Sequence, residues 1–200
     1  TFGGIKEFTP SISIKRKLTI KLPTMQTDKI LNHLITENGL CPRGIDIFNE
    51  SQKDIYKVIS ASIKWVELFI EHENAIKMLE FLSEEEIILF AKKGVILNRK
   101  VNLVNPNLET IILLGNSEAD IQINDFGVVQ IYALNDSKLN LKSSDFGIVY
   151  IDSHHRANVT VEKKDNSKIT ISQYDNSVVK GDAKINKKEW VRNEIFNYKH

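Results

Sequence analysis

A ten-residue repeat restricts the fold of this chain more than any other sequence feature. Its seven consecutive blocks begin at residues 115, 125, 135, 145, 155, 165 and 175. The third residue of each block is Ser, Gly or Ala and the fifth is apolar, as is the seventh except for Gly181. Asp and Asn are frequent at the first two positions. Because so short a unit cannot bury its apolar face alone, the blocks must stack on one another.

The residue types within each block predict a parallel β-solenoid. Alternate apolar residues turn one face of a short strand inward, while Asp and Asn tolerate the left-handed backbone of a tight corner. An antiparallel meander would also give a spacing near ten residues, but it does not explain why every position matches between blocks. The tripeptide Asp-Phe-Gly recurs at 125–127 and 145–147, so we expect about 20 residues per coil, with Phe126 above Phe146. Coils of three blocks would instead place Phe126 over Arg156.

The residues before the repeat follow other periodicities. An alternating stretch at 17–22, ended by Pro23, predicts a strand. Apolar residues then recur at steps of three or four, which predicts a small helical bundle. Helices are expected around 30–35, over about 51–71, over 73–82, and after a capping box formed by Ser83 and Glu86.

The predicted fold class is therefore α+β, with an N-terminal strand and a small helical bundle followed by the parallel β-solenoid. The expected regions are an extended N-terminal segment (1–24), a helical domain (25–98), the solenoid (99–186) and a C-terminal cap or tail (187–200). Both ends of a short solenoid need covering. We expect the helical bundle to cap one end, and the apolar tail to cap the other or to contact a neighbouring subunit.

Composition narrows the range of partners. The formal net charge is +1, which gives no basic excess for nucleic-acid binding. Cys41 is the only cysteine, so no internal disulfide can form, and it is expected to be a small buried residue. No apolar run approaches the ~18 residues of a membrane span, and the start lacks a signal-peptide pattern. We expect a cytoplasmic or virion-associated protein that contacts neither nucleic acid nor membrane.

A twenty-residue coil predicts two outer faces of different character. One face, which includes Glu118, Lys138 and Asn158, is mixed in charge and expected to be solvated. The other is apolar and aromatic, as contact surfaces often are. This second face, the candidate binding site, carries Val128, Gln130, Tyr132, Ile148, Tyr150 and Asp152. It would pack against the protein's own N-terminal segment, a sister subunit or a foreign ligand.

Two groups at the predicted corners have the residue types of metal ligands. Asp125, Asp145 and Asp165 would form a ladder that either holds a cation or caps turns, and we expect each to cap its own turn. His154 and His155 are expected in a solvated turn, because further ligands do not converge on them in sequence. We therefore predict no metal and no cofactor.

The sequence carries no recognisable catalytic motif. It contains no nucleophile elbow, zinc-protease helix, P-loop or dinucleotide fingerprint, and we expect no enzymatic activity. The blocks at 165–167 and 175–177, each Asp-Asn-Ser followed by alternating apolar residues, resemble short solenoid repeats of phage and prophage proteins from low-GC gut bacteria. The resemblance implies a structural or attachment module of a particle, and we expect this module to form a homo-oligomer. The alternatives are an inhibitor or adaptor that binds a host or defence protein, and a carbohydrate-binding or carbohydrate-active β-helix.

Overall fold

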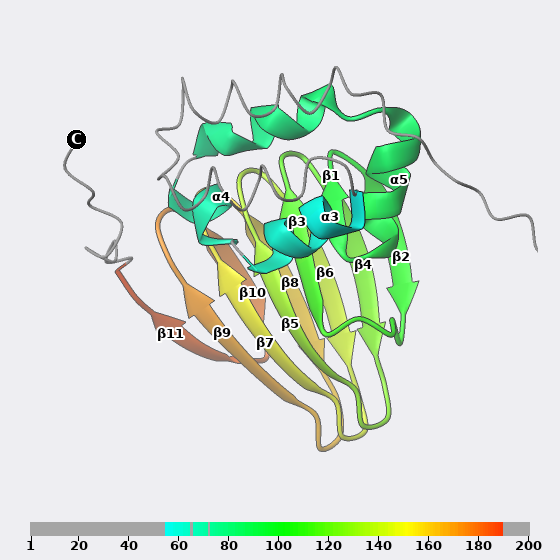
Figure 1. Ribbon diagram of the computed structural model, residues 1–200. Coiled ribbons are helices and arrows are strands. Elements are labelled where there is room, and N and C mark those ends of the chain that lie inside the picture. The colour runs from blue at the N-terminus through cyan, green and yellow to red at the C-terminus, as the bar shows by residue number, and fades with distance from the viewer. Residues whose placement is uncertain (1–54, 65, 72, 190–200) are drawn as a thin grey trace, which may run out of the picture.

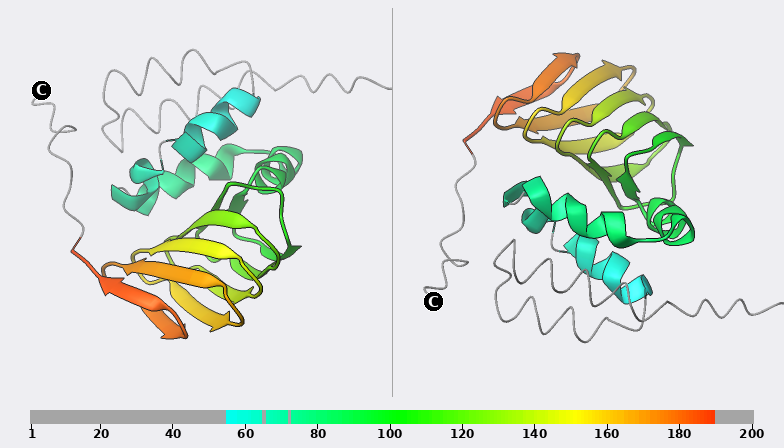
Figure 2. Two further views of the ribbon diagram at one scale, coloured as in Figure 1. Left: turned by 90° about the horizontal axis from the view of Figure 1, so that it is seen from below. Right: turned by 90° about the horizontal axis from the view of Figure 1, so that it is seen from above.

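A computed structural model describes residues 55–64, 66–71 and 73–189 of the chain. The strand predicted at 17–22, the helix predicted around 30–35, Cys41 and the tail from residue 190 lie outside this part. The described residues form a parallel β-solenoid with a layer of short helices against one side (Figures 1 and 2).

In the described part of the chain, eleven parallel strands make up two sheets that face each other across the solenoid. Sheet A contains β1 (Val95–Leu97), β3 (Thr110–Leu114), β5 (Val128–Ala133), β7 (Ile148–Ser153), β9 (Lys168–Gln173) and β11 (Lys184–Lys187), in that order. Sheet B contains β2 (Lys100–Val104), β4 (Glu118–Ile123), β6 (Lys138–Ser143), β8 (Asn158–Lys163) and β10 (Val178–Gly181). The chain alternates between the sheets, so two consecutive strands complete one coil.

The strand register confirms the coil of about 20 residues. Val128 lies beside Ile148 in sheet A, and Lys138 lies beside Asn158 in sheet B. The rings of Phe126 and Phe146 stack with their centroids 5.0 Å apart and their planes at 3°. Like residues therefore lie above one another every second block, and coils of three blocks are excluded.

The corners are built by the first and third residues of each block. The first residue has positive φ, as in Asn135 at 58° and His155 at 57°. The backbone N–H of this first residue donates a hydrogen bond to the side chain of the residue twenty positions later, at the same place in the next coil. Asn135 N donates to His155 Nδ1 at 3.0 Å, and His155 N donates to Asp175 Oδ2 at 2.9 Å. The third residue is buried in every block except that of Gly127, and a small residue fits there. In the last block the Ser177 hydroxyl donates to the carbonyl oxygens of Ser153 and Tyr174. Neighbouring corners are thus tied together as the coils stack.

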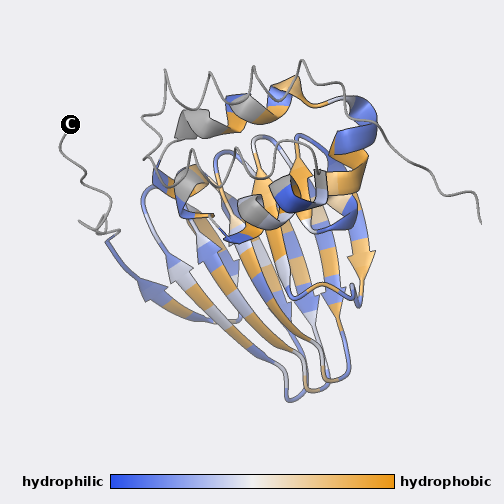
Figure 3. Cartoon of the chain, viewed as in Figure 1, coloured by the Kyte–Doolittle hydropathy of each residue, from blue (hydrophilic) through white to orange (hydrophobic). Residues whose placement is uncertain are grey.

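The core of the solenoid consists of the inward-facing residues that the alternation of apolar and polar residues along each block predicts. Strands β4 to β7 alternate between buried and more exposed residues. Figure 3 shows hydrophobic and hydrophilic residues alternating in bands along the strands. Ile121, Ile131 and Leu139 are completely buried in one apolar cluster. Burial of these rows supplies the main stabilisation of the stacked coils.

The helical region contains α3 (Ile55–Lys64), α4 (Glu67–Glu71), the 3-10 helix η1 (Glu73–Phe81) and α5 (Glu84–Lys92). The predicted capping box is present, since the Ser83 side chain accepts from Glu86 N and the Glu86 carboxylate accepts from Ser83 N. The span predicted as one helix over 51–71 contains two described helices, and the next segment is a 3-10 helix.

The helices lie mainly across the outer face of sheet A, so they cap an end of the solenoid only in part, where α5 packs beside the terminal strand β1 (Figure 2). Phe69 and Phe90 share a buried cluster with Ile112, Leu114 and Leu134 of the sheet A side. Strand β3 is buried along both faces, unlike the alternating strands that follow it. Its outward apolar residues require a cover, and the helices provide it. Helix α5 also reaches the solenoid core, through Ala91.

The regular repeat ends at Gly181. Its φ is +107°, and a Cβ there would lie 1.9 Å from the carbonyl oxygen of Val161, so glycine is required at this position. Only Asp182 and Ala183 then connect β10 to β11. This short connection brings Lys184 beside Thr170, and the last turn is tighter than the preceding coils.

Replacing Ile131 by Ala should test the inward row of β5. Ile131 is fully buried, and an Ile-to-Ala change in a core costs about 2–5 kcal/mol of unfolding free energy. Val128→Ala in the same strand is the matched control, because Val128 is exposed and its truncation should cost less than about 1 kcal/mol. Urea unfolding followed by circular dichroism measures both. Equal losses for the two variants would contradict the assigned inward and outward rows.

Candidate functional site

The six residues of the predicted binding site lie on the outer face of sheet A, in strands β5 and β7. The register pairs Val128 with Ile148, Gln130 with Tyr150, and Tyr132 with Asp152. The sequence therefore placed these residues correctly beside one another. Their environments differ along the strands, because the helical layer covers only part of the face.

Tyr132 lies at the covered end of this face. It is half-buried and packs against the helical cluster that contains Phe69 and Leu79. Burial raises the pKa of its phenol above the usual value, and the nearby Asp152 acts in the same direction. Tyr132 is therefore an internal contact between the helices and the sheet.

Gln130 and Asp152 form a polar pair in the middle of the face. The Gln130 side-chain amide donates to Asp152 Oδ2 at 2.9 Å. Burial raises the pKa of Asp152, although hydrogen bonds from Ser172 and Gln130 and the charge of Lys188 oppose that shift. These donors hold the carboxylate in place on the sheet surface.

The uncovered end of the face forms an apolar patch, which we define as Phe126, Val128, Phe146, Ile148 and Tyr150. Val128 is 59% exposed and Tyr150 is 48% exposed. Phe126 and Phe146, at the adjoining corner, are 78% and 50% exposed. The two phenylalanines were not among the predicted site residues. The sequence did carry a signal for these two phenylalanines. Each stands at the second position of an exposed turn, just before the strand residue Val128 or Ile148, and this place could have added both to the predicted site.

The aspartate ladder ties corners together. Asp145 Oδ2 accepts from Asp125 N at 3.3 Å, and Asp165 Oδ2 accepts from Asp145 N at 3.4 Å. The carboxylates of Asp145 and Asp165 thus cap the corner of the preceding coil, and not their own turns as the sequence predicts. Among the described residues, no three His, Cys, Asp or Glu side chains gather as metal ligands.

His154 lies in the protein interior, and the expectation of a solvated turn is wrong for it. Its ring is 1% exposed and stacks on Tyr174 with centroids 4.2 Å apart. Burial lowers its pKa to about 4, against the opposing charge of Asp175, whose Oδ2 lies 3.7 Å from His154 Nδ1. The twenty-residue period could have indicated this position, because the apolar Leu134 lies one coil earlier and is also buried under the helices.

His155 joins the solenoid corner to the helical layer. Its Nδ1 accepts from Asn135 N, and its Nε2 lies 2.9 Å from the carbonyl oxygen of Ile70 in α4. With Nδ1 acting as an acceptor, the bond to Ile70 requires the hydrogen on Nε2. Both histidines therefore have structural contacts at the boundary between the two layers.

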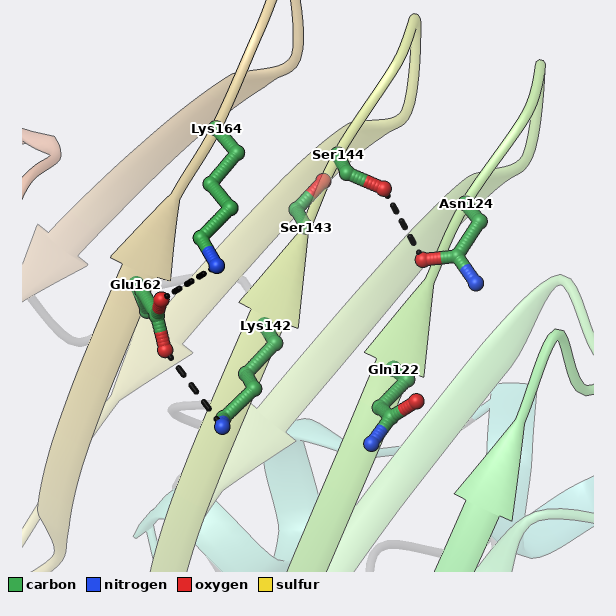
Figure 4. Close-up of a pocket in the computed structure, with 7 residues that line it drawn as sticks. All are labelled: Gln122, Asn124, Lys142, Ser143, Ser144, Glu162 and Lys164. Atoms are coloured by element: carbon green, nitrogen blue, oxygen red, sulfur yellow. Dashed lines mark hydrogen bonds and ion pairs between the residues drawn. The ribbon is translucent and has the colours of Figure 1, made fainter.

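The outer face of sheet B is polar, with a shallow hollow of about 150 Å³ near one corner (Figure 4). Glu162 lies 3.5 Å from Lys142 and 3.0 Å from Lys164, and these lysines lower the pKa of its carboxyl group. The Ser144 hydroxyl donates to Asn124 Oδ1 at 3.0 Å. Similar ladders connect Glu118 with Lys138 and Asp120 with Asn140. These contacts satisfy the polar groups mutually, as expected for a solvated face.

Comparison of the chain with protein-family models, with curated proteins and with solved structures gave no match. None of the described helices combines the length and the apolar character needed to cross a bilayer. Any functional assignment must therefore be argued from the geometry of the chain itself.

The low pKa of His154 should make stability depend on pH. Between about pH 6.5 and about pH 4 the unfolded chain binds the His154 proton more strongly than the folded chain, so stability should fall as the pH falls through this range. The full effect is about 3 kcal/mol. His154→Phe keeps an aromatic ring over Tyr174 but removes the titration. Urea unfolding across this pH range should show a weaker pH dependence for the variant, and equal dependence in both proteins would contradict the assignment.

Proposed function

We propose that this protein is a non-enzymatic binding module that uses the apolar patch of sheet A to contact another protein, first of all a second copy of itself. The observation that carries the proposal is the exposure of Val128 and Tyr150 on one face, with the exposed Phe126 at the adjoining corner. The outer face of sheet B instead carries ladders of charged and polar side chains. Apolar side chains gathered on one side of a polar surface are typical of contact sites.

The stacking of the patch favours a rigid contact. Phe126 and Phe146 support each other through their stacked rings, while Val128 and Ile148 are held in register by the sheet. Aromatic side chains that are already ordered lose little conformational entropy on binding. The patch therefore has the composition and rigidity of a protein contact surface.

The described polar hollow favours a non-enzymatic role. Glu162 is the only carboxylate that lines it, and two lysines neutralise that group. Hydrolysis of a glycosidic bond usually needs two carboxyl groups placed on opposite sides of the bond. The hollow thus gives no support to the carbohydrate-active alternative.

We further propose that the module belongs to a phage-type particle or attachment structure, in which the solenoid serves as a spacer or contact surface. The support is the repeat chemistry at 165–167 and 175–177 together with an extended, regularly stacked scaffold. An inhibitor or adaptor that binds a foreign protein through the same patch remains the alternative, and self-association separates the two.

The combined variant Val128→Ser and Tyr150→Ser should weaken self-association by at least about tenfold, because burial of both apolar side chains at a contact is lost. Size-exclusion chromatography with light scattering over a concentration series measures the effect. Val104→Ser is the matched control, since Val104 is 58% exposed on strand β2 of the other sheet.

Two outcomes would contradict the proposal. A wild-type protein that stays monomeric at every concentration would exclude the second copy as the partner. An oligomer that the Val128 and Tyr150 variant forms as readily as the wild type would exclude the patch as the contact.

A further inference from the structure

Strand β11 is the last strand of sheet A among the residues that the structure describes. It pairs with β9 on one side, and no described strand pairs with its other side (Figure 1). The backbone N–H and C=O groups of such an edge can bind a further strand. The edge of β10 in sheet B is less suitable, because its strand ends at the strained Gly181.

The register of β11 fixes which side chains would flank an added strand. Ile185 lies beside the buried Ile171 and therefore belongs to the inward row. Lys184 lies beside Thr170 and belongs to the outward row, together with Lys188. The Lys188 ammonium lies 5.9 Å from the centre of the Tyr174 ring on this outer face.

This end of the outer face is positively charged. Lys168 of β9, Lys184 of β11 and Lys188, which directly follows β11, are all exposed. Asp152 of β7 is partly buried and accepts a hydrogen bond from Gln130, and the exposed Asp182 and Glu189 lie just before and just after the stretch from Lys184 to Lys188. The outward row of β11, with Lys184 and Lys188, is the part of this edge that is complementary to a negatively charged segment.

The inward row of β11 contains one apolar residue, which can contact an added strand, and one charged residue, which opposes pairing between two copies of this edge. Ile185 is 38% exposed, so an apolar side chain on an added strand would extend the solenoid core. Lys187 follows in the same row, and a charged residue at an edge opposes pairing with an identical edge. Two copies joined through β11 would bring their lysines together, which disfavours a second copy as the occupant of this edge.

We propose that the free edge of β11 binds an extended acidic segment of a partner protein, which joins sheet A as its next strand. The segment carries two carboxylates four residues apart, beside Lys184 and Lys188, and an apolar residue beside Ile185. This mode of binding combines backbone hydrogen bonds with side-chain selection. The proposed peptide site lies at β11 and not at the apolar patch. An experiment can therefore contradict this proposal without contradicting the proposed function, and the reverse.

A synthetic peptide tests the proposal with the full chain. The probe is a fluorescein-labelled nine-residue peptide of Thr and Val with two Glu residues four positions apart, and its binding is followed by fluorescence anisotropy. We expect it to bind at least about tenfold more tightly than the same peptide with Lys in place of Glu. Methylation of alternate backbone amides, on the side that would face β11, should abolish binding.

Charge reversal on the protein locates the site. The combined variant Lys184→Glu and Lys188→Glu should bind the lysine peptide more tightly than the glutamate peptide, the reverse of the wild-type protein. The control combines Lys77→Glu and Lys92→Glu, two exposed lysines of the helical layer, and should keep the original preference. The proposal is overturned if the glutamate peptide does not bind, if the methylated peptide binds equally well, or if reversal at β11 leaves the preference unchanged.

Discussion

The stacking of like corners every twenty residues is the constraint on which the rest of this structure depends. Each corner places its first residue at positive φ, and the N–H of that residue would be left without a partner inside its own turn. The side chain one coil later accepts it, as Asn135 does for Gly115 and Asp175 does for His155. A buried or half-buried amide without a partner is costly, so these bonds fix the register between coils. Once the register is fixed, all inward rows meet in one core.

The same register gives the molecule two different outer faces. Every second block contributes to the same sheet, so any difference between odd and even blocks is gathered onto one side. In sheet B this places Glu118 beside Lys138 and gives a polar surface. In sheet A it places Val128 beside Ile148 and gives the apolar patch. A functional asymmetry thus arises from a repeat whose inward positions are nearly uniform.

Several features could be predicted because they depend on local or periodic chemistry. The coil length followed from the recurrence of Asp-Phe-Gly, and the capping box at Ser83 followed from the spacing of two side chains. The place of the helices could not be predicted in this way. It depends on the outward residues Ile112 and Leu114, whose continuous apolar run is compatible with a buried strand or with a helix. The covering of Tyr132 and the burial of His154 follow from the same packing.

The sequence by itself determined the solenoid, its two-block coil, the inward rows and the neighbours within the predicted site. These follow from the period and the residue types, because identical units can satisfy their backbone and bury their apolar rows only by stacking in register. Tertiary structure alone decided which part of the sheet A face remains exposed. The helices approach that face from a distant part of the chain and cover Tyr132 while leaving Val128 and Tyr150 uncovered. The helices and the strands have different sequence periods, so contacts between them produce no repeating pattern in the sequence. These contacts become visible only when the elements are packed together.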